Sequence, residues 1–541
     1  MVRTAKYWLF QMLMVLLFSS CYNSAKDNRA IFHYNETTGI ASLDPAFAKN
    51  QSIMWAVHQL YNTLVEVDSS LHIVPSLATH WTISDDRKTY TFYLRPDVFF
   101  QDDVSFSNGN GRRMVASDVV YSFQRLMNSK TASPGAWIFN GKVDSVEPFK
   151  AINDTTFQLK LTHPYQPILG ILSMQYCSVV PHEAVEKWGT DFRRHAVGTG
   201  PFQEVAWEEG QALILKKNPH YFERDSSGQP LPYLDGVNVT FYDSKATEFL
   251  LFRQGKLDFI NDIDASFKDE ILTKRGTLRP AWQNKIVLQT HPYLNIEYLG
   301  LLIDSTNPLV SSSPTRLRAV RQAINYGFDR RKMMLYLRNS IGIPAESGFV
   351  PVGLPSFDST DVRGYTYNPQ KARELLKEAG ITNAAPAIKL FTIPIYADMA
   401  DYIAKQLSEV GLNVQVDVVQ KSLLLEMTAG SKALFFRGSW LADYPDAENY
   451  LSVFYSRNPA PPNYTRYHNP KFDALFEKAI AETNDSLRYA LYRQADQLVM
   501  QDAPVVPLWY DEVIHLVQPN ITGFQPNALN LLELRHVKIV K

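Results

Sequence analysis

Charged and aromatic residues gather in the segment from Leu434 to Tyr450. Its apolar start, which ends at Phe436, predicts the end of a buried strand. The side chains after it that could do chemistry are Arg437, Trp440, Asp443, Tyr444 and Asp446. A carboxylate flanked by aromatic residues suits a primary ammonium group, which needs one counter-charge and apolar walls. Alternatively, Asp443 caps a turn before Pro445 and Trp440 fills core, and the residue types alone leave both interpretations open.

The elements that must position this loop alternate between helix and strand. After about Tyr293, the pattern predicts helix 316–326, a helix capped by Asn368 with Pro369 as its first residue, strand 388–395, helix 397–410, strand 414–418 and strand 433–436. This alternation is typical of α/β architecture. Ligands of open α/β sheets bind just outside the carboxyl ends of strands, so the loop after residue 436 is well placed to bind one.

Composition limits the class of protein. A chain of 541 residues with 45% hydrophobic and 20% charged residues is globular, and it is long enough for several domains. Its 54 Lys and Arg residues nearly balance 55 Asp and Glu residues, for a formal net charge of -1. A nucleic-acid partner would call for a clustered basic excess, so none is expected.

The first 21 residues form a separate segment. A basic start (Arg3, Lys6) precedes the apolar residues 7–18 and two serines before Cys21. This order predicts a signal peptide over residues 1–21, too short for a membrane-spanning helix. The cysteine after small residues resembles a bacterial lipobox, in which Cys21 carries the lipid anchor; cleavage by ordinary signal peptidase is the alternative. Residues 22–29 are polar and predict a tether.

Motifs for catalysis are absent from the sequence. It contains no Gly-x-Ser-x-Gly elbow, no His-Glu-x-x-His helix, no Walker loop and no Cys-x-x-Cys pair. The 12 histidines are scattered rather than paired at ligand spacing, so no metal site and no cofactor are expected. Gly198-Thr199-Gly200 is followed by Pro201, which predicts a turn rather than a dinucleotide loop. Binding is therefore favoured over catalysis.

Several short motifs, in this order and spacing, resemble one family over nearly all of the mature chain. They are Ser42-Leu43-Asp44-Pro45, Pro75-Ser76-Leu77-Ala78, Leu94-Arg95-Pro96-Asp97, Ala116-Ser117-Asp118-Val119-Val120-Tyr121-Ser122, Val197-Gly198-Thr199-Gly200-Pro201-Phe202, Gly255-Lys256-Leu257-Asp258-Phe259-Ile260, Arg318-Ala319-Val320-Arg321-Gln322-Ala323-Ile324 and Ala503-Pro504-Val505-Val506-Pro507-Leu508. The sequence thereby resembles the extracytoplasmic solute-binding proteins of peptide ABC transporters, the oligopeptide- and dipeptide-binding family, family 5.

The resemblance implies an α/β, two-lobed periplasmic-binding-protein-like fold (type II) with an additional inserted domain. Mapped onto this chain, lobe one would be residues 30–60, 189–290 and 511–541, the inserted domain residues 61–188, and lobe two residues 291–510. The chain would cross between the lobes twice, and the lobes would close over a ligand by a hinge motion.

The resemblance also implies a binding site. Asp443 matches the family's aspartate that pairs with the free α-amino group of a peptide, and Arg437 matches a basic residue near the ligand. The other lobe contributes a clamp near Lys49, where the family's pattern has an acidic residue. The ligand-binding residues implied in this way are Asp443, Arg437, Trp440, Gly438, Leu441, Tyr444, Asn50 and Gln51.

The function implied is the capture of short peptides by their free N-terminus and their delivery to an inner-membrane ABC permease. The protein would be a monomer in the periplasm or cell envelope, anchored to the membrane by lipid, without enzyme activity, cofactor or metal. The same scaffold also serves binding proteins for nickel complexes, oligosaccharides or haem, so these ligands stay open as alternatives. A secreted peptidase or glycosidase is the alternative from a different class.

Overall fold

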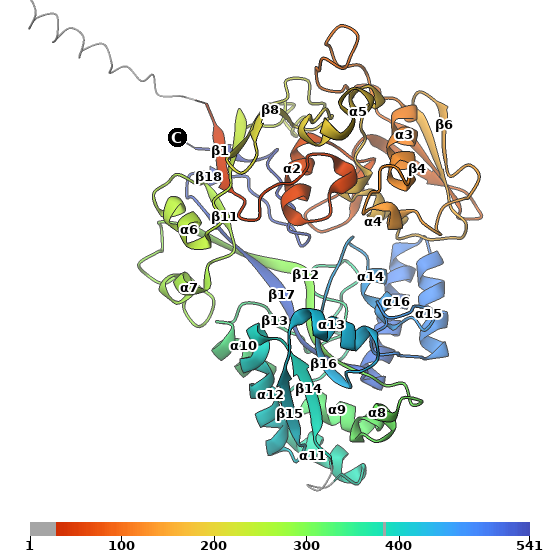
Figure 1. The fold of residues 1–541 in the computed structure, drawn as a ribbon, viewed down its shortest axis with the longest axis vertical. Coiled ribbons are helices and arrows are strands. Elements are labelled where there is room, and N and C mark those ends of the chain that lie inside the picture. The colour runs from red at the N-terminus through yellow and green to blue at the C-terminus, as the bar shows by residue number, and fades with distance from the viewer. Residues whose placement is uncertain (1–28, 382–385, 541) are drawn as a thin grey trace, which may run out of the picture.

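The computed structural model describes residues 29–381 and 386–540 (Figure 1). The predicted signal peptide, the predicted lipidation site Cys21 and all of the predicted tether except Arg29 lie outside these residues. Within the described chain, no helix is long and apolar enough to cross a membrane.

A mixed sheet runs through the whole molecule. Its strands, in spatial order, are β15 (Val414–Val418), β14 (Ile388–Thr392), β16 (Phe435–Leu441), β12 (Val287–Leu301), β17 (Val505–Val517), β11 (Phe259–Asn261), β1 (Ile31–Asn35), β10 (Gly236–Thr240), β9 (Ala212–Lys217) and β8 (Phe202–Glu208), with β13 (Ile343–Pro344) paired to β17. Strands β15, β14 and β16 are parallel to one another, as are β11, β1 and β10. In Figure 1 the molecule has a lower and an upper part. The group β15, β14 and β16 lies in the lower part, and the group β11, β1 and β10 lies in the upper part.

Strands β12 and β17 connect the two parts. They pair with each other along most of their length; at one end β17 also pairs with β11, and at the other end β12 also pairs with β16 (Figure 1). Their antiparallel register is interrupted between Pro292 and Ile296, opposite Glu512 and Tyr510. A break in strand pairing lets a sheet bend locally. The break lies close to the crossing points predicted at residues 290/291 and 510/511, and the division of the chain into lobes stays a prediction.

The lower part in Figure 1 has the predicted alternation of helices and strands. Helices α9 (Arg318–Tyr326), α11 (Pro369–Glu378) and α12 (Ala397–Glu409) contribute apolar residues to one core with β14 and β16. The predicted start of α11 is confirmed, because the side chain of Asn368 accepts a hydrogen bond from the backbone amide of Lys371 at 2.9 Å and Pro369 is the first helical residue. Other helices here are α8 (Pro308–Ser311), α10 (Arg330–Leu337), α13 (Lys421–Ala429), α14 (Glu448–Leu451), α15 (Pro470–Ala481) and α16 (Asp485–Asp502).

The upper part contains a second, separate sheet within residues 61–188. It is antiparallel, in the order β4 (Ala78–Ile83), β5 (Thr89–Leu94), β7 (Thr156–Lys160) and β6 (Phe149–Asn153), and α3 (Ala116–Met127) packs on it. The ring of Phe123 in α3 lies 5.4 Å from that of Phe149 and 5.6 Å from that of Phe157, which fixes the helix on the sheet. The other elements of the upper part are the hairpin β2 (Val65–Val67) and β3 (Ile73–Pro75), β18 (Ile521–Thr522), β19 (Lys538–Ile539), α2 (Gln51–Leu60), α4 (Ile168–Leu172), α5 (His182–Trp188), α6 (Lys245–Arg253) and α7 (Ala265–Ile271).

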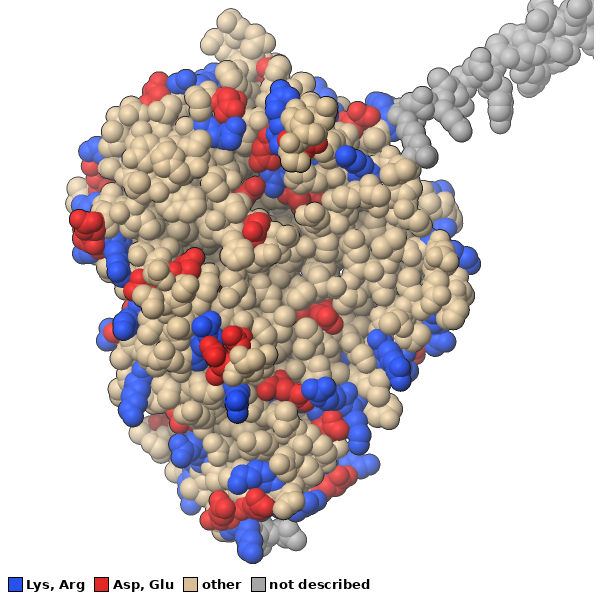
Figure 2. All heavy atoms as spheres, turned by 180° about the vertical axis from the view of Figure 1, so that it is seen from behind, with Lys and Arg blue, Asp and Glu red and all other residues tan. Residues whose placement is uncertain are grey.

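The surface carries charges of both signs. Figure 2 shows Lys and Arg interspersed with Asp and Glu over the lower part of the face seen from behind, and few charged side chains across its middle. This mixture agrees with the nearly balanced count of 54 basic and 55 acidic residues.

Candidate functional site

A cavity of about 190 Å³, here called the Asp443 cavity, is lined mainly by three stretches of the chain, with further residues from β12, from the loop after α3 and from the C-terminal segment. One stretch is the start of α2, one is the segment after α4, and one is the loop that leaves β16. The residues that line it include Lys49, Asn50, Gln51, Met54, Trp137, Met174, Gln175, Tyr176, Tyr293, Leu441, Asp443 and Tyr444. The structure therefore brings five of the eight predicted site residues to one cavity: Asn50, Gln51, Leu441, Asp443 and Tyr444.

The start of α2 holds two of these residues in place. Asn50 caps the helix, because its side-chain oxygen accepts hydrogen bonds from the backbone amide of Ile53 and the hydroxyl of Ser52, both at 3.1 Å. Gln51 accepts a hydrogen bond from Asn261 of β11 at 3.3 Å. Each oxygen is occupied, and neither amide nitrogen has a hydrogen-bond partner within residues 29–381 and 386–540, so both nitrogens can donate to a ligand.

Asp443 is the acidic group of the cavity. Its side chain is exposed to the cavity, yet the surrounding protein excludes enough water to raise its pKa, while a hydrogen bond from Asn449 lowers it. Among residues 29–381 and 386–540, no basic side chain contributes to the pKa of this carboxyl. A carboxylate that lacks a cationic partner and is partly desolvated favours a positively charged ligand.

The loop around Asp443 is rigidly anchored. The carboxylate of the buried Asp446 pairs with the buried Arg488 of α16 and accepts the backbone amide of Glu448 at 2.9 Å. Asp446, counted in the sequence with the residues that could do chemistry, thus holds the loop rather than the ligand. The backbone amide of Ala442 donates to the carbonyl of Leu294 at 2.9 Å, which fixes the other side of Asp443.

Aromatic side chains form much of the cavity wall. The rings of Trp137 and Tyr444 stack with centroids 6.5 Å apart, and Tyr444 itself is buried. The pKa of the Tyr176 hydroxyl is raised to about 12, mainly by burial and also by the negative charge of Asp443. Tyr176 therefore lies near the Asp443 carboxylate. The Asp443 carboxylate thus shares its cavity with several aromatic rings, which suits an ammonium group.

The loop also contacts the part of the chain predicted to be the inserted domain. The hydroxyls of Tyr165 and Tyr444 lie 3.2 Å apart, and the hydroxyl of Tyr444 donates to the carboxylate of Glu448. Burial raises the pKa of Glu448 to about 7. The backbone amide of Gln166 donates to the carbonyl of Ile480 at 2.7 Å. The cavity is therefore bounded by a contact between residues 61–188 and residues 291–510.

The prediction that strand 433–436 ends at Phe436 is wrong. Strand β16 continues to Leu441, so Arg437, Gly438 and Trp440 lie within a strand rather than in a loop. The physical reason is pairing with β12, where Arg437 lies opposite Leu299 and Leu441 opposite Asn295. A charged residue is accommodated inside this sheet because a neighbouring strand supplies its counter-charge.

The remaining three predicted site residues do not line the Asp443 cavity. The guanidinium of Arg437 pairs with the buried Glu297 and lies 4.0 Å from the ring centre of Tyr396. A side chain at Gly438 would place a Cβ atom 2.6 Å from the ring of Tyr298, so glycine permits that close approach.

Trp440 is connected to the cavity indirectly. Its indole N–H donates to the side-chain oxygen of Asn449 at 2.9 Å, and Asn449 is the residue that hydrogen-bonds to Asp443. Trp440 therefore orients the amide that contacts the carboxylate. Direct ligand contacts of Arg437, Gly438 and Trp440 stay predictions.

Several cavity residues were missed by sequence analysis. Trp137 comes from the loop after α3, Met174, Gln175 and Tyr176 come from the segment after α4, and Tyr293 comes from β12. The sequence signal of the aromatic residues and of Met174 was apolar composition, which also predicts ordinary core, and Gln175 gave no signal of its own. Within the described residues, no group of three or more His, Cys, Asp or Glu side chains could hold a metal ion.

Two α/β parts joined by two long strands, with a cavity between segments of both, define the class of two-lobed binding proteins. Residues 72–462 match the family model "Bacterial extracellular solute-binding proteins, family 5 Middle". This match covers most of the chain, and the chain belongs to family 5 of the bacterial extracellular solute-binding proteins.

Two bacterial binding proteins are similar to this chain over most of their length. The chain is 26% identical over 505 residues to the dipeptide-binding protein of Escherichia coli (strain K12), covering 89% of each chain. It is 25% identical over 531 residues to the glutathione-binding protein GsiB of Shigella dysenteriae serotype 1 (strain Sd197), covering 95% of this chain and 94% of that protein.

Solved structures share the fold. HbpA2 from Haemophilus parasuis has a TM-score of 0.83 at 22% identity, over 94% of this chain and all 100% of that chain. The murein tripeptide binding protein MppA, in its unliganded open form, has a TM-score of 0.81 at 22% identity, over 95% and 98% of the two chains. DppA from Helicobacter pylori, in complex with the peptide STSA, has a TM-score of 0.70 at 24% identity, over 94% and 98%. The predicted two-lobed α/β fold is confirmed.

Proposed function

We propose that this protein captures short peptides by their free N-terminus and delivers them to an inner-membrane ABC permease. The observation that carries the proposal is the carboxylate of Asp443, which faces a cavity walled by aromatic rings and receives no contribution from a basic group among residues 29–381 and 386–540. The names of the relatives support a peptide ligand, because they include dipeptide-, glutathione- and murein tripeptide-binding proteins.

Binding proceeds in this proposal by closure of the two lobes. The α-ammonium group pairs with Asp443, while the amide nitrogens of Asn50 and Gln51 donate to peptide carbonyls from the opposite side. Lys49, an exposed cation at the same cavity, is available to the carboxylate at the other end of a short peptide. Because both lobes contact the ligand, binding favours the closed arrangement, with the bend at the register break of β12 and β17.

The proposed location is the periplasm or cell envelope, with Cys21 lipidated as the membrane anchor and the folded part acting as a monomer. An anchored binding protein stays close to its permease, which raises the effective concentration of loaded protein there. No catalytic step is part of the proposal.

The test is calorimetric titration with alanylalanine and with its N-acetylated form. Acetylation removes the positive charge, so the free dipeptide should bind and the acetylated one should bind much more weakly. Equal affinity for both, or binding only of an oligosaccharide, a nickel complex or haem in parallel titrations, would refute capture by the N-terminus. Incubation of the protein with the dipeptide, followed by chromatography, should recover it uncleaved.

A further inference from the structure

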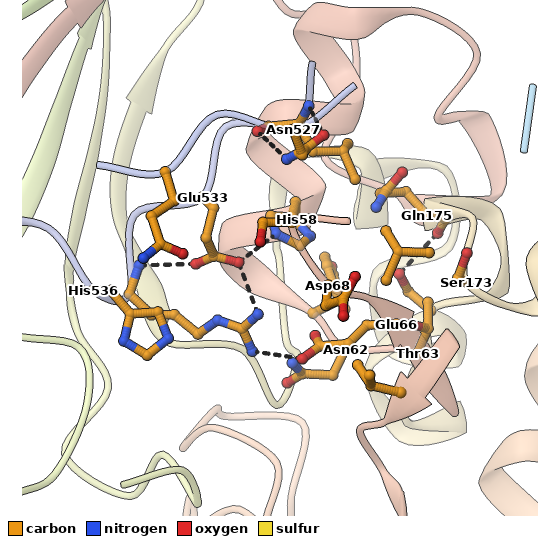
Figure 3. Close-up of a pocket in the computed structure, with 18 residues that line it drawn as sticks. His58, Asn62, Thr63, Glu66, Asp68, Ser173, Gln175, Asn527, Glu533 and His536 are labelled. Carbon is orange, nitrogen blue, oxygen red and sulfur yellow. Dashed lines mark hydrogen bonds and ion pairs between the residues drawn. The ribbon is translucent and has the colours of Figure 1, made fainter. Parts of the chain in front are cut away.

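Figure 3 shows a second cavity, of about 260 Å³, which shares lining residues with the Asp443 cavity. We call it the acidic cavity. It is bounded by the end of α2, the hairpin β2–β3 and the segment 525–536. Ser173, Gln175 and Leu531 line both cavities, so the two lie on either side of one shared wall.

Gln175 in this shared wall is an unpaired polar side chain. Only 6% of the residue is exposed, and its side-chain amide forms no hydrogen bond within the described part of the chain. Figure 3 shows it on the side of the cavity opposite Glu533. Its neighbour Ser173 differs, because the Ser173 hydroxyl donates to the carbonyl of Gly170 at 2.7 Å. Because this amide lines both cavities and has no protein partner among the described residues, it can donate a hydrogen bond to a ligand and accept one from it.

Negative charge exceeds positive charge around the acidic cavity. The single guanidinium of Arg535 contacts three carboxylates, those of Glu66 at 3.2 Å, Glu223 at 2.8 Å and Glu533 at 2.8 Å. His58 contacts Glu533 at 3.1 Å, and Asp68 adds a further carboxylate to the lining.

The local electrostatics reflect this excess. The pKa of Glu66 is raised above its ordinary value. Burial is the largest cause, and the negative charges of Glu223 and Glu533 act in the same direction, while Arg535 opposes them. A cation placed in the cavity would relieve the repulsion among these carboxylates, whereas an anion would increase it. The cavity therefore selects for positive charge.

We propose that the acidic cavity binds the ammonium or guanidinium end of the first side chain of a bound peptide, with Gln175 hydrogen-bonded to the peptide where it passes from one cavity to the other. The inference rests on the proposed function, because Asp443 must hold the α-ammonium group of the same residue. It predicts that, among short peptides, those that begin with a lysine- or arginine-like residue bind most tightly. Their long, flexible side chains carry the required charge away from the backbone.

The test compares lysylalanine with norleucylalanine, in which a methyl group replaces the side-chain ammonium group. By calorimetry at pH 7, the wild-type protein should bind lysylalanine about tenfold more tightly, as expected for a partly desolvated charge contact. Glu66→Gln should remove most of that preference, while Glu208→Gln, at an exposed strand position far along the chain, should keep it. Gln175→Leu should weaken both dipeptides.

Norleucylalanine serves as the folding control, because its affinity should be the same in wild type and Glu66→Gln. Equal affinity of the wild type for the two dipeptides would overturn the inference while leaving N-terminal capture intact. A lysine preference that survives in Glu66→Gln would place the cation elsewhere and would also overturn it. Binding of neither dipeptide would instead refute the proposed function.

Discussion

Replacing Asp443 by asparagine removes a negative charge from the cavity while keeping the shape of the side chain. If a peptide ammonium group pairs with this carboxylate, the asparagine variant loses the charge pair but retains the hydrogen bond from Asn449, since an amide oxygen can also accept it. The variant therefore tests electrostatic recognition rather than packing.

The size of the effect follows from the surroundings of Asp443. Loss of one member of a desolvated charge pair costs about 2–5 kcal/mol. The Asp443 side chain is exposed, so hydration of the carboxylate before binding offsets part of the attraction and the lower half of that range applies. We expect a loss of about 2–3 kcal/mol, or roughly a 30- to 150-fold weaker affinity.

The assay is a cycle of two proteins and two ligands, measured by calorimetry. Wild type and Asp443→Asn are each titrated with alanylalanine and N-acetylalanylalanine, and Asp401→Asn, an exposed carboxylate in α12, is the matched control. Acetylation should weaken binding strongly in wild type and in the control, and only slightly in Asp443→Asn. An equal effect of acetylation in all three proteins would refute the pairing of Asp443 with the ammonium group.

Three further predictions concern stability and location. Arg437→Ala should lower the free energy of unfolding by about 3–5 kcal/mol in urea titrations, because it leaves the buried Glu297 without its counter-charge; an unchanged midpoint would contradict this. Glu448 has a folded pKa raised to about 7, so the folded state holds its proton more tightly and this group makes stability fall as the pH rises from about 4.5 through 7. Relative to wild type, Glu448→Gln should gain up to about 3 kcal/mol between pH 5 and pH 8, and a constant difference would contradict the raised pKa. Cys21→Ala should move the protein from the membrane to the soluble fraction of cell extracts, and retention in the membrane would argue against lipidation at this residue.

The sequence predicted helix and strand ends correctly where neighbouring residues determine them. The start of α11 follows from Asn368 and Pro369, which act on the backbone within one turn of their own positions. The end of β16 was misplaced because the cause is distant: Arg437 stays inside the sheet through Glu297, which is 140 residues away in the chain. A charged residue after an apolar run indicates a strand end only when no neighbouring strand supplies its partner.

For the candidate site, too, the sequence predicted some residues and missed others. Asp443 stood out because aromatic residues surround it in sequence, and Asn50 and Gln51 entered through the family resemblance. Tyr176 and Trp137 reach the same cavity from the segment that follows the small antiparallel sheet and from the loop after α3. Only the packing of stretches that are distant in the chain reveals them, because aromatic residues in a core and in a binding wall have the same sequence pattern.

A crystal structure of the protein with bound alanylalanine tests the central claim most directly. The account predicts that the peptide lies in the Asp443 cavity with its ammonium nitrogen within hydrogen-bond distance of the Asp443 carboxylate and with the two lobes closed over it. A dipeptide bound with its carboxylate end toward Asp443, or bound outside this cavity, would contradict capture by the free N-terminus.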